Sequence, residues 1–341
     1  MIHGTKQDKI LGQEFSVFLS KKLKKKFSFL TIQRIFGGAS RETYRVALKD
    51  EDQSTVNFIY RRSQNSSLIE TDQKTEYFAY SDFQETEVPV PRLVVLEESS
   101  DVLGAPFMVM EELPGKVASP FDKEAYIPHE DEIGRQFWKI LGKIASHDLT
   151  NSKLKELSEV KTLQDCWKEQ LEYWIEVIRK DSLGVEPILE AAIRELQRSE
   201  PLPATRLSIV HGDYRNGNFL FEGKRITGIL DWEMAHIGDP LEDLGWALSE
   251  IWCWEKQETP AYLIKREEAL DIWAQESKIE INKDSLFWWE LFACVKGLAI
   301  WISAGHEFST GSNTDPVNLF SAWVPGDIHL EIILDKLESL L

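Results

Sequence analysis

A short non-helical insert within a helical half constrains this sequence most strongly. Residues 208–231 contain apolar, β-rich segments around Gly217 and Gly223. Elsewhere in the second half, apolar periodicity predicts helices at roughly 130–148, 162–181, 186–198, 240–253, 260–277, 283–304 and 326–340. The strands of the insert would hold a polar loop at one end and return Asp231 toward that loop through a hairpin. We therefore expect the chemistry of the protein to lie in this insert.

Three polar side chains can converge there: Asp213, Asn218 and Asp231. Phosphoryl transfer uses such a set. One carboxylate orients a hydroxyl nucleophile, while a second carboxylate and an amide oxygen hold Mg²⁺ against nucleotide phosphates. Because this chemistry consists mostly of positioning and charge neutralisation, oxygen ligands alone suffice.

The first part of the chain is typical of a leading helix followed by a small sheet with one inserted helix. The leading helix ends near Leu23, and the later helix is expected around residues 67–83. Strands are expected at 32–36, 43–47, 56–62, 93–97 and 107–111. Leu113-Pro114-Gly115 is a turn-rich connector. It divides the chain into a sheet-bearing lobe, 1–112, and a helical lobe, 113–341, that holds the insert.

Charge and length exclude several classes of function. The net charge of −18 opposes nucleic-acid binding, because a phosphate backbone requires a basic footprint. Residues 1–112 carry a net charge of −2 and the remainder −16, so the acidity belongs to the second half. We expect the apolar run 286–302 to be too short and too charged to span a membrane. Three widely spaced cysteines and no secretory signal pattern indicate the reduced cytoplasm.

The motifs of the insert resemble a known family. His211-Gly212-Asp213, then Asn218, then Asp231-Trp232-Glu233 are similar to the aminoglycoside phosphotransferase family, which has a protein-kinase-like fold. The stretch 231–245 is especially similar to the branch related to kinase-like domains fused to acyl-CoA dehydrogenases. The resemblance implies an α+β, two-lobed fold with a small antiparallel-sheet N-lobe and a larger, mainly helical C-lobe. It also implies a small-molecule kinase that transfers the γ-phosphate of ATP or GTP to a substrate hydroxyl, with Mg²⁺.

The resemblance assigns roles within the insert. Asp213 matches the catalytic aspartate, and Asn218 and Asp231 match the metal ligands. His211 either braces the loop or acts as a base, with bracing favoured. Further positions stay open. Glu233 has a metal-shell or a loop-bracing role, and Leu220 and Leu230 pack beneath the adenine or serve as plain core leucines.

In the N-lobe, the resemblance places a phosphate-covering loop at Gly37, Gly38 and Ser40. Kinase-like folds place a lysine on the third strand, but this chain has Tyr60-Arg61-Arg62. By the resemblance Arg61 takes that position, which puts Ile59 on the same face as the roof over the adenine; Arg62 would put Tyr60 there instead. The resemblance further implies an ion pair from this arginine to Glu76 on the next helix. It also implies a hinge, which meets the base around three residues: Met110, Glu111 and Leu113.

In the C-lobe, the sequence predicts a capped helix start and an aromatic core. Asp239-Pro240-Leu241-Glu242 predicts a capping box, and the resemblance makes Asp243 a brace beneath the catalytic loop. All twelve tryptophans lie after residue 137, and most are expected in an aromatic core, although indoles of this region can also build a pocket wall.

The sequence leaves the acceptor and the class of function partly open. The acceptor is a hydroxylated metabolite or acyl thioester, which we favour slightly, or an aminoglycoside. The missing lysine keeps open a nucleotide-binding regulator without turnover. A helical interaction protein that binds no nucleotide ranks last.

Overall fold

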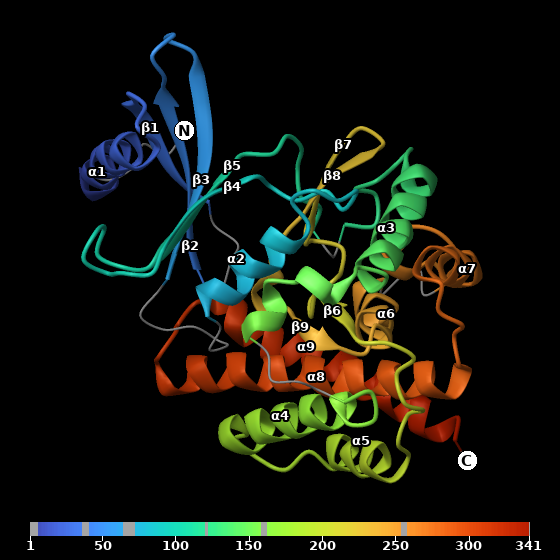
Figure 1. The fold of residues 1–341 in the computed structure, drawn as a ribbon. Helices are drawn as coiled ribbons and strands as arrows, with labels where there is room; N and C mark the ends of the chain where they lie inside the picture. Colours follow the sequence, from blue (N-terminus) through green and yellow to red (C-terminus); the bar gives the residue numbers. More distant parts are fainter. Residues whose placement is uncertain are drawn as a thin grey trace.

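The computed structural model describes residues 6–35, 41–63, 72–119, 122–157, 162–253 and 258–340. A sheet-bearing lobe at the N-terminal side stands on a larger helical lobe (Figure 1). The large-scale division therefore follows the expected α+β arrangement. The boundary after residue 112 stays a prediction, although the sheet does end at Glu111.

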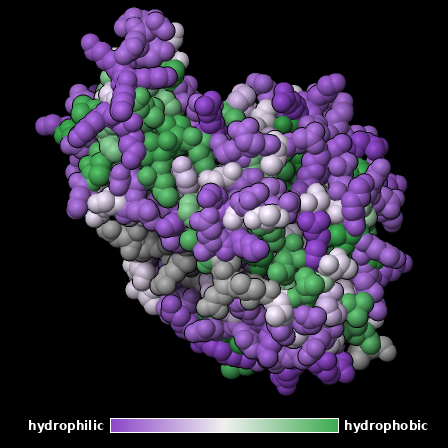
Figure 2. All heavy atoms as spheres, in the orientation of Figure 1, coloured by the Kyte–Doolittle hydropathy of each residue, from purple (hydrophilic) through white to green (hydrophobic). Residues whose placement is uncertain are grey.

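Five antiparallel strands form the N-terminal sheet in the order β1-β2-β3-β5-β4. Their bounds are β1 Ser28–Ile35, β2 Arg41–Lys49, β3 Thr55–Ser63, β4 Leu93–Glu97 and β5 Phe107–Glu111. Alternation along the strands sends Tyr44 and Tyr60 to one face, where Phe15 of α1 (Lys6–Leu23) packs 5.1 Å from Tyr60. Figure 2 shows hydrophobic residues gathered over this lobe, whereas most of the remaining visible face is hydrophilic.

The opposite face of the sheet turns toward the helical lobe. Ile59 and Met110 are register partners on β3 and β5, and Ile59 packs against the core cluster that continues into the helices. Helix α2 (Gln73–Asp82) lies beside this face and buries Glu76 completely. Its first turn is capped by Asp72, which accepts a hydrogen bond from Lys74 N.

The helical lobe is assembled around α8 (Lys283–Thr310), the longest described helix. Helices α4 (Cys166–Asp181), α5 (Pro187–Arg198), α6 (Leu241–Ala247) and α9 (Pro316–Glu338) pack against it. Helix α3 (Glu130–Ala145) packs on α7 (Arg266–Ser277). Because neighbours cover α8 on several sides, it is apolar around much of its circumference.

The length of α8 corrects one expectation. Its 28 residues make it the one described helix that is long and apolar enough to cross a membrane by length and composition, so the argument from shortness is wrong. Of its most apolar window, 78% is buried inside the protein, as in a core helix.

The insert forms two small antiparallel pairs. β6 (Ser208–Val210) pairs with β9 (His236–Gly238), and β7 (Phe219–Glu222) pairs with β8 (Arg225–Ile229). Short 3₁₀ turns complete the described chain: η1 Leu149–Asn151, η2 Leu154–Leu157, η3 Trp232–Met234, η4 Glu250–Trp252 and η5 Pro260–Tyr262. The expected hairpin therefore exists, and it returns the chain to the polar loop.

Some helix boundaries differ from the expected ones. Helix α9 starts ten residues earlier than residue 326, because Pro316 occupies the first turn and Pro325 is accommodated inside the helix. The expected helix 240–253 ends at Ala247 and continues as η4, and the expected helix 260–277 begins as η5. Residues 64–71, which include the start of the expected helix 67–83, lie outside the described residues.

The tryptophans mostly confirm the expected aromatic core. Five of them are among the largest fully buried side chains: Trp138, Trp232, Trp246, Trp273 and Trp289. By contrast, Trp323 on α9 is 67% exposed. The aromatic content of the second half is therefore mainly structural.

Candidate active site

The polar loop between β6 and β7 brings Asp213 and Asn218 into contact. The Asn218 amide nitrogen donates to Asp213 Oδ2 at 2.6 Å and to the Asp213 carbonyl at 2.9 Å. Gly212 has φ +84°, and a Cβ there would collide with the Met234 carbonyl, so glycine is required.

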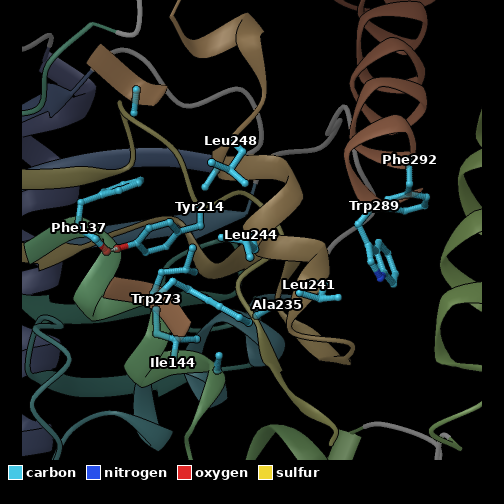
Figure 3. Close-up of a cluster of buried hydrophobic side chains, with 14 of the residues drawn as sticks. Phe137, Ile144, Tyr214, Ala235, Leu241, Leu244, Leu248, Trp273, Trp289 and Phe292 are labelled. Carbon is cyan, nitrogen blue, oxygen red and sulfur yellow. Dashed lines mark hydrogen bonds between the residues drawn. The ribbon is translucent and has the colours of Figure 1, made fainter. Parts of the chain in front are cut away.

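Tyr214 anchors the same loop in the core. Its hydroxyl, directed at the backbone of Phe137 in Figure 3, donates to the Phe137 carbonyl on α3 at 2.7 Å, and the two ring centroids lie 4.5 Å apart. The loop is thus fixed to the helical lobe from below.

Asp231 follows β8 at the mouth of this loop. Leu230 N donates to the Asn218 carbonyl at 2.8 Å, so the hairpin places Asp231 directly beside the loop. Asp231 has φ +66° and ψ +53°, a left-handed conformation that costs a non-glycine residue about 1–3 kcal/mol. Strain of this kind is concentrated at functional sites. Asp213 and Asn218 are therefore in contact, and Asp231 follows the residue that is bonded to Asn218, as the hairpin predicted.

Arg61 connects the sheet to this position. Its guanidinium contacts Glu76 Oε1 at 2.6 Å and Asp231 Oδ1 at 2.9 Å. The expected ion pair to Glu76 is confirmed. Arg62 lies on the other face of β3 and contacts Glu42 at 3.5 Å, so Arg61, with Ile59 on the same face, occupies the cleft.

Burial and charge act against each other in this cluster. Burial raises the pKa of Glu76 to about 7, although Arg61 opposes the rise. Burial also acts to raise the pKa of Asp231, but the Arg61 guanidinium outweighs it and holds that pKa below its ordinary value. Desolvation would lower the pKa of Arg61, yet the two carboxylates keep it well above its usual range. The arginine thus remains charged in the cleft.

His211 is a brace in this structure. Asp213 N donates to His211 Nδ1 at 3.1 Å, so Nδ1 carries no proton, and Nε2 donates to the Leu230 carbonyl at 2.9 Å. The ring is fully buried, which lowers the pKa of His211 to about 4. With both nitrogens engaged, the neutral imidazole ties the Asp213 loop to the residue before Asp231.

Asp243 on α6 supports the loop from the other side. Its carboxylate accepts hydrogen bonds from His211 N at 2.6 Å and Gly212 N at 2.9 Å. The bracing contact implied by the resemblance is confirmed. Burial raises the pKa of Asp243 to about 6, although both backbone donors oppose the rise.

The expected capping box is wrong in one half. Asp239 does accept from Leu241 N at 2.8 Å, but Glu242 does not return to the cap. Instead it is buried between Lys296 Nζ on α8 and His236 Nε2, both at 3.0 Å. A buried carboxylate needs charged partners, and these lie across the fold and not in the helix turn. Lys296 Nζ also donates to the Gly212 carbonyl at 2.6 Å.

Three side chains near Asp213 were not predicted from the sequence to contact it or its neighbours: Trp246, Arg215 and Trp252. Trp246 Nε1 donates to Asp213 Oδ1 at 2.9 Å. Arg215 Nε contacts the same oxygen at 3.0 Å, and its guanidinium lies over the Trp252 ring at 4.7 Å. Arg215 stands two residues after Asp213, a proximity that could have signalled it. Nothing in the spacing identified Trp246.

The residues expected at the nucleotide do not all share one environment. The side chains of Leu113 and Leu220 both lie against Gly228 of β8, where an added Cβ would meet them. Leu230 is partly buried between Asn218 and the strained Asp231. Met110 is buried, and Glu111 is exposed with its N–H bound to the Arg92 carbonyl.

One expected feature cannot be placed. The glycine-rich segment with Gly37, Gly38 and Ser40 lies outside the described residues. The described strands β1 and β2 end and begin on either side of it.

A cavity of about 260 Å³ adjoins the insert. Residues 233–236, the start of α2, one side of α4 and Lys296 line it. Three of its lining residues are carboxylates: Asp72, Glu169 and Glu233. Part of the acidity of the chain therefore faces a cavity beside the candidate site.

Comparison with known proteins places the chain in a family. A family model described as the phosphotransferase enzyme family matches residues 31–277. The chain belongs to this phosphotransferase family. Acyl-CoA dehydrogenase family member 10 of Mus musculus is 27% identical over 215 residues, which are 62% of this chain and 19% of that protein. Viomycin phosphotransferase of Streptomyces vinaceus is 27% identical over 150 residues, 41% of this chain and 48% of the relative. The matched part is thus less than half of either relative.

Solved structures of phosphotransferases have a similar fold. An aminoglycoside phosphotransferase candidate from Ralstonia eutropha JMP134 superposes with a TM-score of 0.76 at 18% identity, covering 96% of this chain and 98% of that one. A thermostable mutant of aminoglycoside phosphotransferase APH(4)-Ia, in ternary complex with ADP and hygromycin B, gives 0.63 at 14% identity, covering 94% and 98%. The family resemblance and the two-lobed α+β fold are therefore confirmed.

Proposed function

We propose that this phosphotransferase family member is an Mg²⁺-dependent small-molecule kinase that transfers the γ-phosphate of ATP or GTP to a substrate hydroxyl. The observation that carries the proposal is that Asp213 and Asn218 are in contact beside Asp231, which Arg61 of the sheet reaches. Phosphoryl transfer depends on such positioning and charge neutralisation.

The residues fit a magnesium site. The Asn218 nitrogen is turned to Asp213, which leaves its amide oxygen for a cation, and Asp231 keeps 31% of its side chain exposed. Mg²⁺ uses one or two protein ligands together with phosphates and water, so these two side chains suffice. Asn218 and Asp231 would hold it, and when bound it would neutralise charge on the phosphates.

The side chains divide the remaining work. Arg61 offers a forked donor to phosphate oxygens once a nucleotide competes for it, while Glu76 keeps it in place. Ile59, Met110, Leu113, Leu220 and Leu230 would enclose the base. The hinge backbone near Glu111 and Leu113 would bond its edge, and Gly37, Gly38 and Ser40 would cover the phosphates.

Asp213 orients the acceptor hydroxyl and takes its proton. The hydroxyl oxygen forms a bond to the γ-phosphorus, and the bond from that phosphorus to the β,γ-bridging oxygen breaks. The nucleoside diphosphate leaves with the electron pair of the broken bond, and the proton passes from Asp213 to solvent. No further reactant is needed.

The acceptor is a small hydroxyl compound. The carboxylates of the adjoining cavity disfavour an anionic group there and favour a neutral or cationic end. The similarity to dehydrogenase-related proteins favours a hydroxylated metabolite or acyl thioester, whereas the phosphotransferase relatives favour an aminoglycoside. We propose the metabolite class first and the aminoglycoside class second.

We also propose a reducing, cytoplasmic location. The three cysteines of the chain are buried in the structure, and their wide spacing in the sequence gives no disulfide framework.

A phosphorylation screen tests the proposal. Purified protein is incubated with Mg²⁺ and ATP or GTP against a panel of hydroxylated metabolites, acyl thioesters and aminoglycosides. We expect nucleotide-dependent phosphorylation of at least one compound, and loss of that activity by a factor of about 10³ or more in Asp213→Ala. Circular dichroism checks that the variant is folded.

Two results would count against a kinase. Mg²⁺-dependent nucleotide binding with no turnover on any compound favours a regulator without turnover. No turnover, no nucleotide hydrolysis and no nucleotide binding would remove the proposal altogether.

A further inference from the structure

The Asp213 carboxylate is held at both of its oxygens. Oδ1 accepts from Trp246 Nε1 at 2.9 Å and Arg215 Nε at 3.0 Å, and Oδ2 accepts from Asn218 Nδ2 at 2.6 Å and Arg215 Nε at 3.2 Å. Trp246 comes from helix α6, whereas Arg215 and Asn218 belong to the loop before β7. With donors on both edges, the carboxylate cannot turn about its last torsion without breaking a hydrogen bond.

Trp246 is itself fixed from several sides. Lys296 Nζ lies 5.1 Å from the Trp246 ring centroid, and Trp252 packs edge-on at 5.3 Å. Trp252 Nε1 donates to the Trp246 carbonyl at 3.1 Å, and Arg215 stacks on the Trp252 ring. Asp213, Arg215, Trp252 and Trp246 thus form a closed ring of contacts. This ring is the aromatic clamp.

Burial alone does not account for the bond from Trp246 to Asp213. Three other buried indoles, those of Trp138, Trp174 and Trp273, have an Nε1 with no hydrogen-bond partner in the described part of the chain. In Trp246 the group is instead directed at the carboxylate of Asp213.

We propose that Trp246 is a positioning residue, which fixes the orientation of the Asp213 carboxylate for the acceptor hydroxyl. The inference rests on the proposed function, because it assigns a task to Asp213. Trp246 holds Oδ1 while Asn218 holds Oδ2, so the plane of the carboxylate is fixed before the hydroxyl arrives. Small misplacements of a catalytic group cost large factors in rate, so one lost hydrogen bond here is measurable.

The kinetic test replaces the indole without emptying its site. Trp246→Phe keeps an aromatic ring and removes the N–H, and Trp273→Phe makes the same change at a buried tryptophan of α7. We expect kcat of Trp246→Phe to fall about tenfold, with KM for the nucleotide within about twofold of the native value. Trp273→Phe should keep the native kcat. Equal kcat values for the two variants would overturn the proposal.

A second readout does not depend on turnover. The indole N–H resonance of Trp246 is assigned in the ¹⁵N spectrum by its loss in Trp246→Phe. Asp213→Asn should shift this resonance and leave that of Trp273 in place, because of these two indoles it is Trp246 that donates to residue 213. An unmoved Trp246 resonance would contradict the clamp.

The two readouts separate the two proposals. If the native protein has no activity at all, the proposed function fails while the spectra still decide whether the clamp exists. If the native protein is active and Trp246→Phe matches Trp273→Phe in kcat, only the positioning role fails.

Discussion

At the scale of single residues, an arginine occupies the position where kinase-like folds place a lysine. A guanidinium presents a planar fork of donors, so Arg61 reaches Glu76 and Asp231 with different nitrogens. An ammonium is a point charge and would not span the two carboxylates in the same way. Although Arg61 replaces the family's lysine, it still forms an ion pair with Glu76 of α2 and also reaches Asp231 of the insert.

His211 yields a prediction about pH. Its folded pKa, about 4, lies below the ordinary 6.5, so between these values the unfolded chain binds the proton and the folded one does not. The stability contributed by His211 is therefore complete above pH 6.5 and is lost as the pH falls toward 4. We expect His211→Gln to destabilise the protein by about 2 kcal/mol more at pH 7 than at pH 5.

Urea denaturation at both pH values measures this difference. Other titrating groups contribute equally to the native protein and to the variant, so they cancel in the comparison. The same destabilisation at pH 5 and pH 7 would contradict a buried neutral imidazole.

At the scale of elements, three side chains of the short helix α6 support the Asp213 loop. Asp243 accepts from the loop backbone, Glu242 holds Lys296 against the Gly212 carbonyl, and Trp246 donates to Asp213. All seven residues of α6 are buried. Helix α6 packs closely against α8, and Gly245 permits this because it has no Cβ to meet the α8 backbone.

Gly245→Ala tests that approach. A Cβ at Gly245 would lie 2.8–3.0 Å from the backbone of Trp289 and Glu290, so α6 must move away from α8. We expect a loss of about 1–3 kcal/mol in the free energy of unfolding and a lower kcat. The matched control is Gly184→Ala, where nothing lies within 4 Å and stability should be unchanged. Equal stabilities of the two variants would show that the helices have room to spare.

At the scale of the whole molecule, the candidate site lies where the two lobes meet. One cluster of buried residues lies between α1 and the sheet, and a larger one runs through the helices and takes in Met108 and Met110 of β5. Arg61 bridges them at Asp231, and a bound nucleotide would add contacts to both lobes. Ligand binding of this kind stabilises the folded protein by mass action.

Thermal unfolding measures that linkage. With Mg²⁺ and ATP or GTP at about 100 times Kd, we expect a gain of about 2.7 kcal/mol and a rise in Tm of a few degrees. EDTA should remove most of the gain, because Asn218 and Asp231 would hold the metal. If nucleotide and Mg²⁺ left the Tm unchanged, that result would contradict nucleotide binding.

The sequence by itself determined the local elements and the order of the motifs. Apolar periodicity located most helices and strands, and the fixed spacing of Asp213, Asn218 and Asp231 predicted their convergence, because a hairpin brings its two ends together. The family resemblance assigned the cationic position to Arg61 with Arg62 as the alternative, and strand alternation placed these two arginines on opposite faces. The positions of helices, strands and hairpins depend mainly on residues close in the sequence, so periodicity and spacing can predict them.

Only the tertiary structure decided the contacts between distant elements. It turned Glu242 from an expected cap into the partner of Lys296, placed Trp246 on Asp213, and selected Arg61 by setting Glu76 and Asp231 within its reach. Buried charges and indoles choose partners by proximity after packing, and that proximity has no signature in sequence spacing. The motif therefore predicted the family, whereas packing determined how its carboxylates are held.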